Sequence, residues 1–377
     1  MPDSPTDKPH ILFCIKHMAD VAGGAERVLA DVANGLADRG RRVTVLTFDP
    51  PAAKSFYPLS AKVATLRLGP GAASGKPGRL SIFLQIFRLR AAIARLNPDL
   101  AVGFLIGMYV PLAVALIGTG IPVWASEHIV RRHYRNRRLQ YLSIGIVSLL
   151  VARVTFLSPS IADGYAIVAK RKKIVIPDPV APASGQAAPA SGSPGKIILN
   201  VGRLVDFKDH RTLIQAFARL APDFPEWTLR ILGEGELRET LERLVGDLGL
   251  GDRVRMPGAT DRIGAEYVAA QIFAIPSIYE GFGLVTAEAS SHGLPCIGFV
   301  DCPGTNDIIT DGENGILVST DDRIGNLAQG LKQMMADGAL RERMGRKGVE
   351  NMTRYKLDKV LDQWEEKITP CLSSRPA

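Results

Sequence analysis

The feature that most constrains the fold is a regular alternation of short apolar runs with helical patterns along most of the chain. Apolar runs typical of buried parallel strands lie in the first half at 11–16, 43–48, 63–68, 100–104, 122–125, 154–157 and 174–176. They recur in the second half at 197–201, 228–232, 254–256, 272–275, 296–298 and 316–318. Because helices between such runs favour parallel strands, the sequence predicts an α/β fold with two doubly wound sheets.

The size of the chain allows two domains. With 377 residues, 46% of them apolar, it can bury two hydrophobic cores. Residues 181–195 (APASGQAAPASGSPG) are of low complexity and read as a flexible linker or an inserted loop. We therefore predict a first domain over 1–176, a linker over 177–195 and a second domain over 196–354.

One uncharged segment is long enough to cross a membrane. Residues 100–126 contain no charged side chain. However, glycines and prolines divide this stretch where a strand, a short helix and a second strand would meet. Buried parallel strands are also continuous apolar runs. The sequence therefore favours a buried strand–helix–strand unit over a membrane span.

Cysteine usage and the first residues bear on the cellular compartment. The four cysteines show neither a CxxC pair nor a metal-ligand spacing, which favours free thiols in a reducing compartment. The first ten residues are polar and proline-rich, so no signal peptide is predicted. We expect a cytoplasmic protein.

Positive charge is concentrated in the first half. Residues 1–176 hold 24 lysines and arginines against 10 aspartates and glutamates. A basic amphipathic helical pattern covers 79–95, and five arginines lie within 131–138, directly before an apolar helix. A solvated surface, a nucleic-acid patch and an anionic-membrane patch all remain open. Nucleic acid is the least favoured because no aromatic platform or known binding motif accompanies the arginines, whereas apolar helical stripes favour a membrane interface.

A pair of glutamates eight positions apart, Glu280 and Glu288, is the main candidate site. The run before them reads as a strand that ends at Pro276, and 284–292 reads as a helix. Glu280 should therefore lie on a loop at the carboxyl end of a strand, and Glu288 in the following helix. The helix N-terminus between them offers N–H groups to an anion, and carboxylates accept hydrogen bonds from hydroxyls. Such a site suits a ligand with both phosphate and sugar.

Further candidates follow neighbouring strands of the second domain. Arg203 and Lys208 follow its first strand and form a natural clamp for a diphosphate. Gly233, within Gly-Glu-Gly, permits close backbone approach after the next strand. Gly258 follows the third strand, where the chain either presents backbone groups to a nucleobase or makes an ordinary turn.

The first domain contributes two candidates. Gly23 and Gly24 begin a helix after the opening strand, and such a start can receive a phosphate or a sugar at close range. No GxGxxG is present, so a nicotinamide or flavin fingerprint is not supported. His128 follows the strand that ends near Ala125, where a catalytic or binding role competes with a structural one.

Taken together, these motifs resemble the retaining glycosyltransferases of family four, which have the GT-B fold. The resemblance covers nearly the whole chain and is dense in the second domain. The matching segments are Gly23-Gly24-Ala25-Glu26, Gly202-Arg203 with Lys208, Gly233-Glu234-Gly235, Glu280 through Glu288, and Asp311 through Val318. It implies two Rossmann-like domains that face each other across a cleft, with a final helix at about 355–377 that packs back on the first domain.

The resemblance also implies residue roles. Arg203 and Lys208 would contact the diphosphate of a nucleotide-sugar donor, and Glu288 the ribose hydroxyls. Glu280 would lie near the transferred sugar, beside the backbone N–H groups of Phe282 and Gly283. The remaining implied contacts are a catalytic His128, which would reach a sugar hydroxyl across the cleft, and donor-binding Gly23, Gly24, Gly233, Gly258 and Leu284. No metal cofactor is implied, and no DxD-like motif stands in a matching place.

The implied reaction transfers a sugar with retention of configuration from a nucleotide-diphosphate sugar. Residues 290–306 favour a UDP-hexose or UDP-N-acetylhexosamine. The basic first domain suggests a lipid-linked sugar acceptor, used in surface polysaccharide or glycan assembly, and a peripheral location on the inner face of the cell membrane. A sugar-nucleotide epimerase, a phosphorylase and a catalytically inactive sugar-nucleotide-binding protein remain as alternatives.

Overall fold

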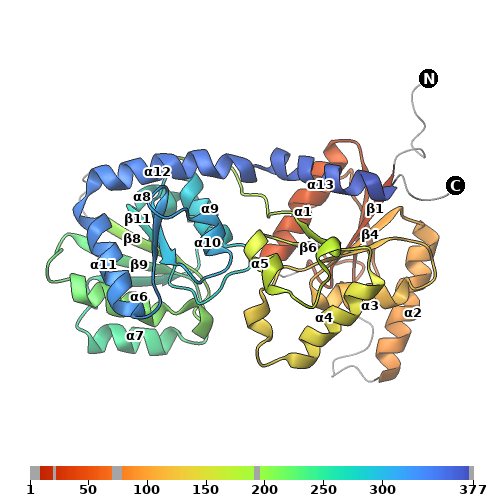
Figure 1. Cartoon of the computed structure of the whole chain (residues 1–377), viewed down its shortest axis with the longest axis horizontal. Coiled ribbons are helices and arrows are strands. Elements are labelled where there is room, and N and C mark those ends of the chain that lie inside the picture. Colours follow the sequence, from red (N-terminus) through yellow and green to blue (C-terminus); the bar gives the residue numbers. More distant parts are fainter. Residues whose placement is uncertain (1–8, 20–22, 70–78, 191–195, 373–377) are drawn as a thin grey trace. The chain divides into compact units, whose positions relative to one another are not determined.

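The computed structural model describes residues 9–19, 23–69, 79–190 and 196–372, and the side chains of 79–83 are left out of the description. Contacts divide the chain into two compact units (Figure 1). Unit 1 comprises Met1–Pro179 and Leu357–Ala377, and unit 2 comprises Val180–Lys356. The return of the chain to unit 1 at Leu357 makes unit 1 discontinuous in sequence.

Unit 1 is built on a seven-stranded, wholly parallel sheet with the strand order β3-β2-β1-β4-β5-β6-β7. Its central strands β1, β4 and β5 are buried along their whole length, as expected for a sheet covered on both faces, whereas the edge strands β3 and β7 are partly exposed. The bounds of the strands are β1 His10–Cys14, β2 Arg42–Thr47, β3 Ala64–Arg67, β4 Leu100–Phe104, β5 Val123–Ser126, β6 Arg153–Phe156 and β7 Lys173–Val175.

Helices cover both faces of this sheet (Figure 1). Helices α1 (Gly24–Asp38) and α13 (Leu357–Leu372) pack together on one face. Helix α3 (Ile106–Ala115) packs between α2 (Arg79–Leu96) and α4 (Arg138–Leu150) on the other. The remaining short elements are η1 Arg131–Tyr134, α5 Pro159–Gly164 and η2 Lys170–Lys172.

Aromatic packing joins α13 to the sheet. Trp364 is buried, lies edge-on to Phe13 of β1 with ring centroids 5.8 Å apart, and stacks on Trp124 of β5 at 6.2 Å. At the helix surface, Arg39 contacts Asp362 at 2.8 Å and Glu365 at 2.9 Å. The last helix therefore completes the core of the first unit.

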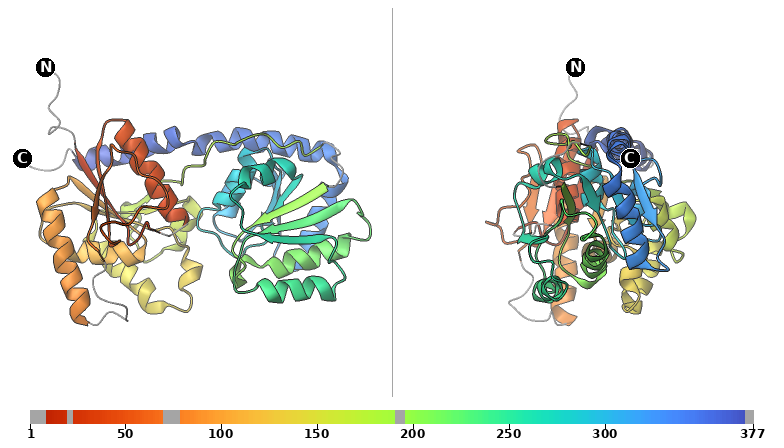
Figure 2. Two further views of the ribbon diagram at one scale, coloured as in Figure 1. Left: turned by 180° about the vertical axis from the view of Figure 1, so that it is seen from behind. Right: turned by 90° about the vertical axis from the view of Figure 1, so that its left-hand side faces the viewer.

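Unit 2 repeats the architecture on a six-stranded parallel sheet with the order β10-β9-β8-β11-β12-β13 (Figure 2). The strands are β8 Lys196–Val201, β9 Trp227–Leu232, β10 Val254–Gly258, β11 Ile272–Ala274, β12 Cys296–Phe299 and β13 Gly315–Val318. The helices are η3 Asp206–Lys208, α6 His210–Leu220, α7 Arg238–Asp247, α8 Ile263–Ala269, α9 Leu284–Ser291, α10 Thr305–Ile308, α11 Arg323–Ala336, α12 Gly338–Met352 and η4 Thr353–Tyr355.

The unit 2 sheet separates two apolar clusters. The larger includes Trp227, Phe217 and Leu331, and the smaller includes Tyr267, Phe273 and Leu294. The predicted α/β class with two doubly wound, parallel sheets is confirmed.

The uncharged segment 100–126 folds as β4, α3 and β5, with Met108 and Leu112 of α3 fully buried. Within the described ranges, no helix is both long and apolar enough to cross a membrane.

The predicted flexible linker over 177–195 is wrong for residues 180–190, which are held against unit 2. The backbone N–H of Ala187 donates to the carbonyl of His292 at 2.7 Å, and buried Arg341 donates to the carbonyl of Pro189 at 2.7 Å. Composition suggested flexibility because these residues bury little apolar surface, but backbone hydrogen bonds fix them instead. Residues 191–195 lie outside the described ranges.

Candidate functional site

The candidate site of unit 2 lies where its strand order reverses. β8 and β11 are neighbours, and the chain winds outward from them in opposite directions. In open α/β sheets, ligands bind beyond the carboxyl ends of the strands at such a switch point. The loop after β8 carries Arg203 and Lys208, and the loop after β11 carries Glu280. The two loops are joined by a hydrogen bond from Ile278 N–H to the Phe207 carbonyl at 2.8 Å.

The centre of this site is an ion pair between Lys208 and Glu280. Lys208 Nζ lies 2.7 Å from one carboxylate oxygen and 2.8 Å from the other. The side chains are only 13% and 10% exposed, so solvent screens the pair little. Ser277 Oγ also donates to Glu280 at 2.6 Å. An ammonium has three donors, and the described residues accept from Lys208 only through the two Glu280 oxygens, which leaves one donor for a ligand oxygen.

Arg203 supplies a second cation at the same edge. It is exposed and forms no ion pair with any described residue, and its guanidinium lies 6.0 Å from the centre of the Phe207 ring. Phe207 stacks on Tyr279 with centroids 4.8 Å apart and planes 6° from parallel. This aromatic pair packs the loop after β8 against the loop after β11, next to Arg203 and Lys208.

The start of α9 adds hydrogen-bond donors. Gly283 is the N-cap with φ +85°, and α9 begins at Leu284, as the sequence predicted. The backbone N–H groups of Phe282, Gly283 and Leu284 donate to no atom of the described chain. Phe282 is buried edge-on against Tyr355, with ring centroids 5.1 Å apart. These groups follow Glu280 directly and can bind an anion.

Gly233 and Gly258 connect neighbouring strands at the same edge. The N–H of Gly233 donates to the Gly258 carbonyl at 2.9 Å. Gly233 has φ +142°, and a Cβ there would lie 2.0 Å from the Gly202 carbonyl oxygen. Gly258 has φ +93°, and its Cβ would meet the side chains of Glu234 and Arg238 rather than backbone. Gly233 is thus required for the backbone itself, before any ligand binds.

Glu288 lies in the second turn of α9 and is 8% exposed. Its carboxylate accepts a hydrogen bond from the Tyr267 hydroxyl at 3.1 Å. Glu280 thus contacts an ammonium and a serine hydroxyl, and Glu288 accepts a hydrogen bond from a tyrosine hydroxyl. Binding of ribose by Glu288 stays a prediction.

In unit 1, Gly23 caps α1 in an extended conformation and Gly24 is its first residue. A Cβ on Gly23 would lie 2.0 Å from a carboxylate oxygen of Glu26, so that carboxylate folds back over the helix start. Burial raises the pKa of Glu26. An anion approaching this turn would meet the Glu26 carboxyl group first.

His128 follows β5 and has a buried ring. Its Nε2 lies 3.0 Å from Ser126 Oγ, which accepts a hydrogen bond from Thr155 Oγ1 at 2.9 Å. Its Nδ1 lies 3.6 Å from Asp178 Oδ1, and the ring stacks on Phe104. Burial lowers the pKa of His128 to about 4 and raises the pKa of Asp178 to about 8. Burial therefore disfavours the charged form of both groups, and the role of His128 toward a donor stays a prediction.

Glu127, next to His128, is fully buried between tyrosines. Its carboxylate accepts hydrogen bonds from the hydroxyls of Tyr109 at 2.6 Å and Tyr134 at 3.3 Å. The N–H of Ile129 donates to it at 3.0 Å. Burial raises the pKa of Glu127 to about 7, against the lowering effect of these donors. Tyr134 belongs to η1, so Glu127 anchors the arginine-rich turn to the core.

Stability of unit 1 should depend on the protonation of Glu127. Because its folded pKa is raised above the unfolded value, the stabilisation is fully present below about pH 4.5 and is lost as pH rises through 7. The loss is up to about 3 kcal/mol. Glu127→Gln should make the fall in stability between pH 5 and 8 shallower, as measured by urea unfolding, and leave the part due to Asp178. Asp163→Asn, at an exposed position in α5, is the control. An unchanged slope in Glu127→Gln would contradict the assignment.

Several site residues were not predicted from the sequence. Ser277 and Asp178 complete the surroundings of Glu280 and His128. Arg323, at the start of α11, donates to the Pro276 carbonyl at 2.6 Å and to Asp209 at 3.0 Å. It therefore links the loop after β11 to the loop after β8. No motif marks these residues in the sequence, and Arg323 is 114 positions away from its partner Asp209.

Two family models match the chain and together span most of it. The model described as "Glycosyltransferase Family 4" matches residues 22–183, and the model described as "Glycosyl transferases group 1" matches residues 186–351. The first match lies in unit 1 except for its last four residues, 180–183, and the second lies within unit 2.

Similar proteins agree with these matches. The chain is 38% identical over 188 residues to an exopolysaccharide phosphotransferase of Streptomyces coelicolor, which covers 50% of this chain but only 20% of that protein. It is 26% identical over 345 residues to an α-1,4-N-acetyl-D-galactosaminyltransferase of Campylobacter jejuni. The name of that enzyme specifies a diphospho-undecaprenol-linked acceptor, and the match covers 91% of this chain and 94% of that one.

Solved structures share the fold. A sucrose-phosphate synthase from Thermosynechococcus elongatus superposes with a TM-score of 0.82 at 21% identity, covering 98% of this chain and all of that one. The Anabaena protein HepE in complex with UDP-glucose gives a TM-score of 0.73 at 18% identity, covering 96% and 99%. Two Rossmann-like units with a switch-point site and these matches define a glycosyltransferase of the GT-B fold. The chain belongs to the family-four glycosyltransferases.

Proposed function

We propose that this glycosyltransferase moves a sugar, with retention of configuration, from a nucleotide-diphosphate sugar to a lipid-linked sugar acceptor in polysaccharide or glycan assembly. The observation that carries the donor class is the grouping of Arg203, Lys208 and the α9 N-terminus at one sheet edge. Guanidinium, ammonium and backbone N–H groups are the donors that diphosphates accept from. A UDP-hexose or UDP-N-acetylhexosamine is favoured, in line with the UDP-glucose bound by HepE.

The proposed chemistry follows from where charge develops. As the glycosidic bond breaks, negative charge grows on the diphosphate and positive charge on the sugar ring. Arg203 and the free donor of Lys208 stabilise the leaving group, while the Glu280 carboxylate lies beside Lys208, where it can hold sugar hydroxyls. Glu288 is proposed to hold the ribose. We also propose that no metal is needed, since these cations and the α9 donors supply the positive charge.

The acceptor class is supported by the Campylobacter relative, which acts on a diphospho-undecaprenol-linked sugar. It is also supported by the surface of unit 1, where five arginines lie next to exposed apolar side chains of α4. Both features favour peripheral binding to an anionic membrane from the cytoplasmic side. The free thiols of Cys14, Cys296 and Cys302 agree with a reducing compartment.

Donor identity and stereochemistry can be measured together. A UDP-sugar should raise the melting temperature more than GDP- or ADP-sugars, through ligand linkage. With that donor and a polyprenyl-diphosphate-linked sugar, proton NMR of the product should show the donor's anomeric configuration, and EDTA should leave the rate unchanged. An inverted linkage would rule out retention. Turnover of the donor without an acceptor would indicate an epimerase or hydrolase. Donor binding without turnover would indicate an inactive binding protein.

A further inference from the structure

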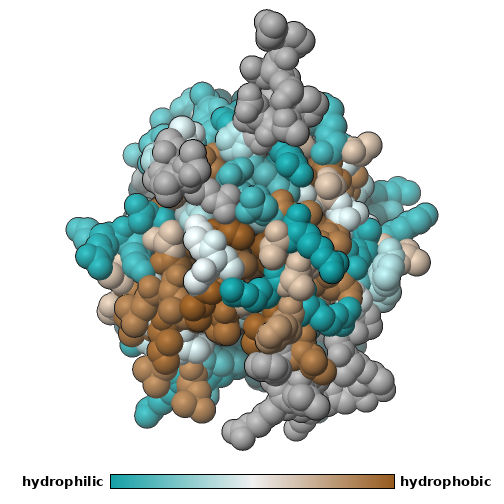
Figure 3. Space-filling view, turned by 90° about the vertical axis from the view of Figure 1, so that its right-hand side faces the viewer, coloured by the Kyte–Doolittle hydropathy of each residue, from teal (hydrophilic) through white to brown (hydrophobic). Residues whose placement is uncertain are grey.

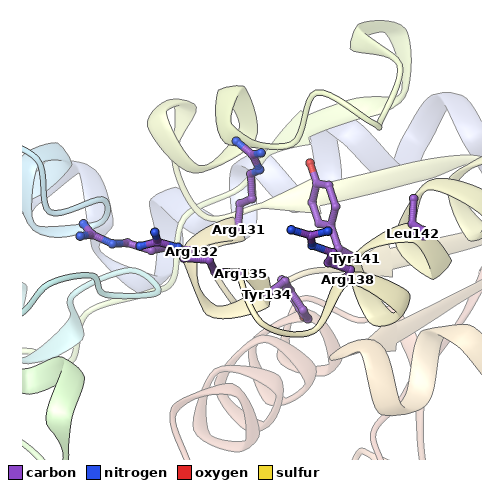
Figure 4. A pocket seen from close by; sticks show the side chains of 7 residues that line it. All are labelled: Arg131, Arg132, Tyr134, Arg135, Arg138, Tyr141 and Leu142. Carbon is purple, nitrogen blue, oxygen red and sulfur yellow. The ribbon is translucent and has the colours of Figure 1, made fainter.

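Unit 1 carries a basic pocket formed by η1 and the start of α4. The pocket has a volume of about 630 Å³. It is lined by Arg131, Arg132, Tyr134, Arg135, Arg138, Tyr141 and Leu142 (Figure 4). The side chains of Arg131 and Arg138 converge with Tyr141, and the Arg131 guanidinium lies 5.5 Å from the centre of the Tyr141 ring.

Three of the four arginines that line this pocket have no carboxylate partner among the described residues. Arg131, Arg135 and Arg138 form no ion pair within the described part of the chain, whereas Arg39 of the same unit contacts three carboxylates. The carboxyl group beneath the turn, Glu127, is buried and bound by tyrosines. Like charges held this close repel each other unless an anion lies between them. Guanidinium groups bind phosphate oxygens in bidentate fashion.

The start of α4 adds to the positive potential. The helix begins at Arg138 and continues for 13 residues, with no acidic residue in its first turn. Its first N–H groups and the positive end of its dipole therefore lie at the wall of the pocket. The pocket thus combines side-chain and backbone donors for an anion.

A stripe of exposed apolar residues continues from the pocket along α4. Leu139, Leu142, Ile146 and Leu149 are 84%, 56%, 63% and 76% exposed. They recur at helical spacing on one face, opposite the buried Ile144 and Val147. Leu142 also lines the pocket, so the stripe and the pocket are continuous.

The apolar surface extends beyond α4. Val114 and Ile117, in and just after the neighbouring α3, and Leu84 and Phe87 of α2 are also exposed. Figure 3 shows apolar side chains gathered on this side of unit 1. Contiguous apolar surface of this kind marks a binding surface rather than a solvated one.

We propose that the pocket binds the diphosphate group of the lipid-linked acceptor and that the stripe on α4 receives the first part of its hydrocarbon chain. This inference rests on the proposed function and assigns the acceptor subsite within it. An amphiphile with a phosphate head and an apolar tail matches both surfaces at once. Nucleic acid would leave the leucines exposed, and a symmetric dimer through this face would bring the two arginine turns together.

The experiment measures binding of the full chain to vesicles, without turnover. Three compositions are compared: phosphatidylcholine alone, phosphatidylcholine with phosphatidylglycerol, and phosphatidylcholine with undecaprenyl diphosphate at the same surface charge. We expect both anionic vesicles to bind more protein than the neutral ones. We expect the undecaprenyl diphosphate vesicles to bind at least tenfold more tightly than the phosphatidylglycerol vesicles.

Matched variants assign the effect to the pocket. Arg131→Ala/Arg138→Ala should abolish the tenfold preference, whereas Lys170→Ala/Arg171→Ala, which removes the same charge from an exposed turn of unit 1, should retain it. Leu139→Ser/Ile146→Ser should weaken binding to every vesicle. Circular dichroism and donor-induced melting shifts check that each variant is folded.

Two outcomes would overturn the proposal. One is equal affinity of the wild-type protein for the two anionic vesicles, which would reduce the pocket to a general anionic docking surface. The other is an unchanged preference in Arg131→Ala/Arg138→Ala with normal folding. Failure of the proposed function would be seen differently, as absence of sugar transfer or of donor binding while vesicle binding persists.

Discussion

Replacing Lys208 with alanine is expected to lower the rate of sugar transfer by about a hundredfold or more. Loss of one preorganised donor to a developing negative charge costs about 3 kcal/mol in the transition state. Lys208 also neutralises Glu280, which is 8% exposed and 2.7 Å away. Removing one partner of such a pair leaves a carboxylate without its cation and destabilises the fold by up to about 3 kcal/mol. Initial rates with donor and acceptor, and urea unfolding, measure the two effects.

A double-mutant cycle separates these two roles of Lys208. Glu280→Gln removes the buried charge, so Lys208→Ala/Glu280→Gln should be more stable than Lys208→Ala but no faster. Lys347→Ala, which breaks an exposed ion pair with Glu350 in α12, is the control and should change neither quantity. Near-normal turnover in both Lys208→Ala and Arg203→Ala would refute the proposed diphosphate clamp.

Gly233→Ala should destabilise unit 2 whether or not a donor is present. At φ +142°, an alanine is strained, and its Cβ would lie 2.0 Å from the backbone oxygen of Gly202. The oxygen belongs to the neighbouring loop and can move only if the carboxyl ends of β8 and β9 separate. We expect a loss of about 3 kcal/mol. Hydrogen exchange with mass spectrometry reports the two units separately and should show faster exchange in β8 and β9.

Two other glycines calibrate this result. Gly251→Ala lies in open space and should have little effect. Gly258→Ala should be intermediate, because φ is +93° but its Cβ would meet side-chain atoms of the Glu234–Arg238 ion pair, which yield more readily than backbone. If Gly233→Ala exchanged no faster than Gly251→Ala, the close approach of Gly233 to Gly202 would not be a constraint on the fold.

The sequence predicted those features that depend on local pattern. Helix α9 was placed at 284–292 and runs over Leu284–Ser291, because an N-terminal glycine and Gly293 mark its ends. The strands were recognised because buried parallel strands are uninterrupted apolar runs. Arg203, Lys208 and Glu280 were placed at one sheet edge, since parallel strands present their carboxyl ends on the same side.

Features that depend on packing could not be predicted in this way. The pairing of Lys208 with Glu280 joins residues 72 positions apart, and either could have pointed to solvent. The segment 180–190 was misjudged because its order comes from hydrogen bonds to α9 and α12 rather than from apolar burial. The pattern of α4 indicated an apolar helix, but only the fold shows that Leu139 and Ile146 are left uncovered.

The return of α13 to unit 1 sets an order of events during synthesis. All seven strands of the first sheet are synthesised early. Phe13 and Trp124 can pack against Trp364 only after it has been synthesised, more than two hundred residues later. Unit 2, contiguous from Val180 to Lys356, is complete before then. Since domains generally fold as they emerge from the ribosome, the second unit should reach its native state first. The nascent first unit meanwhile leaves the α13-binding face of its core open to chaperones.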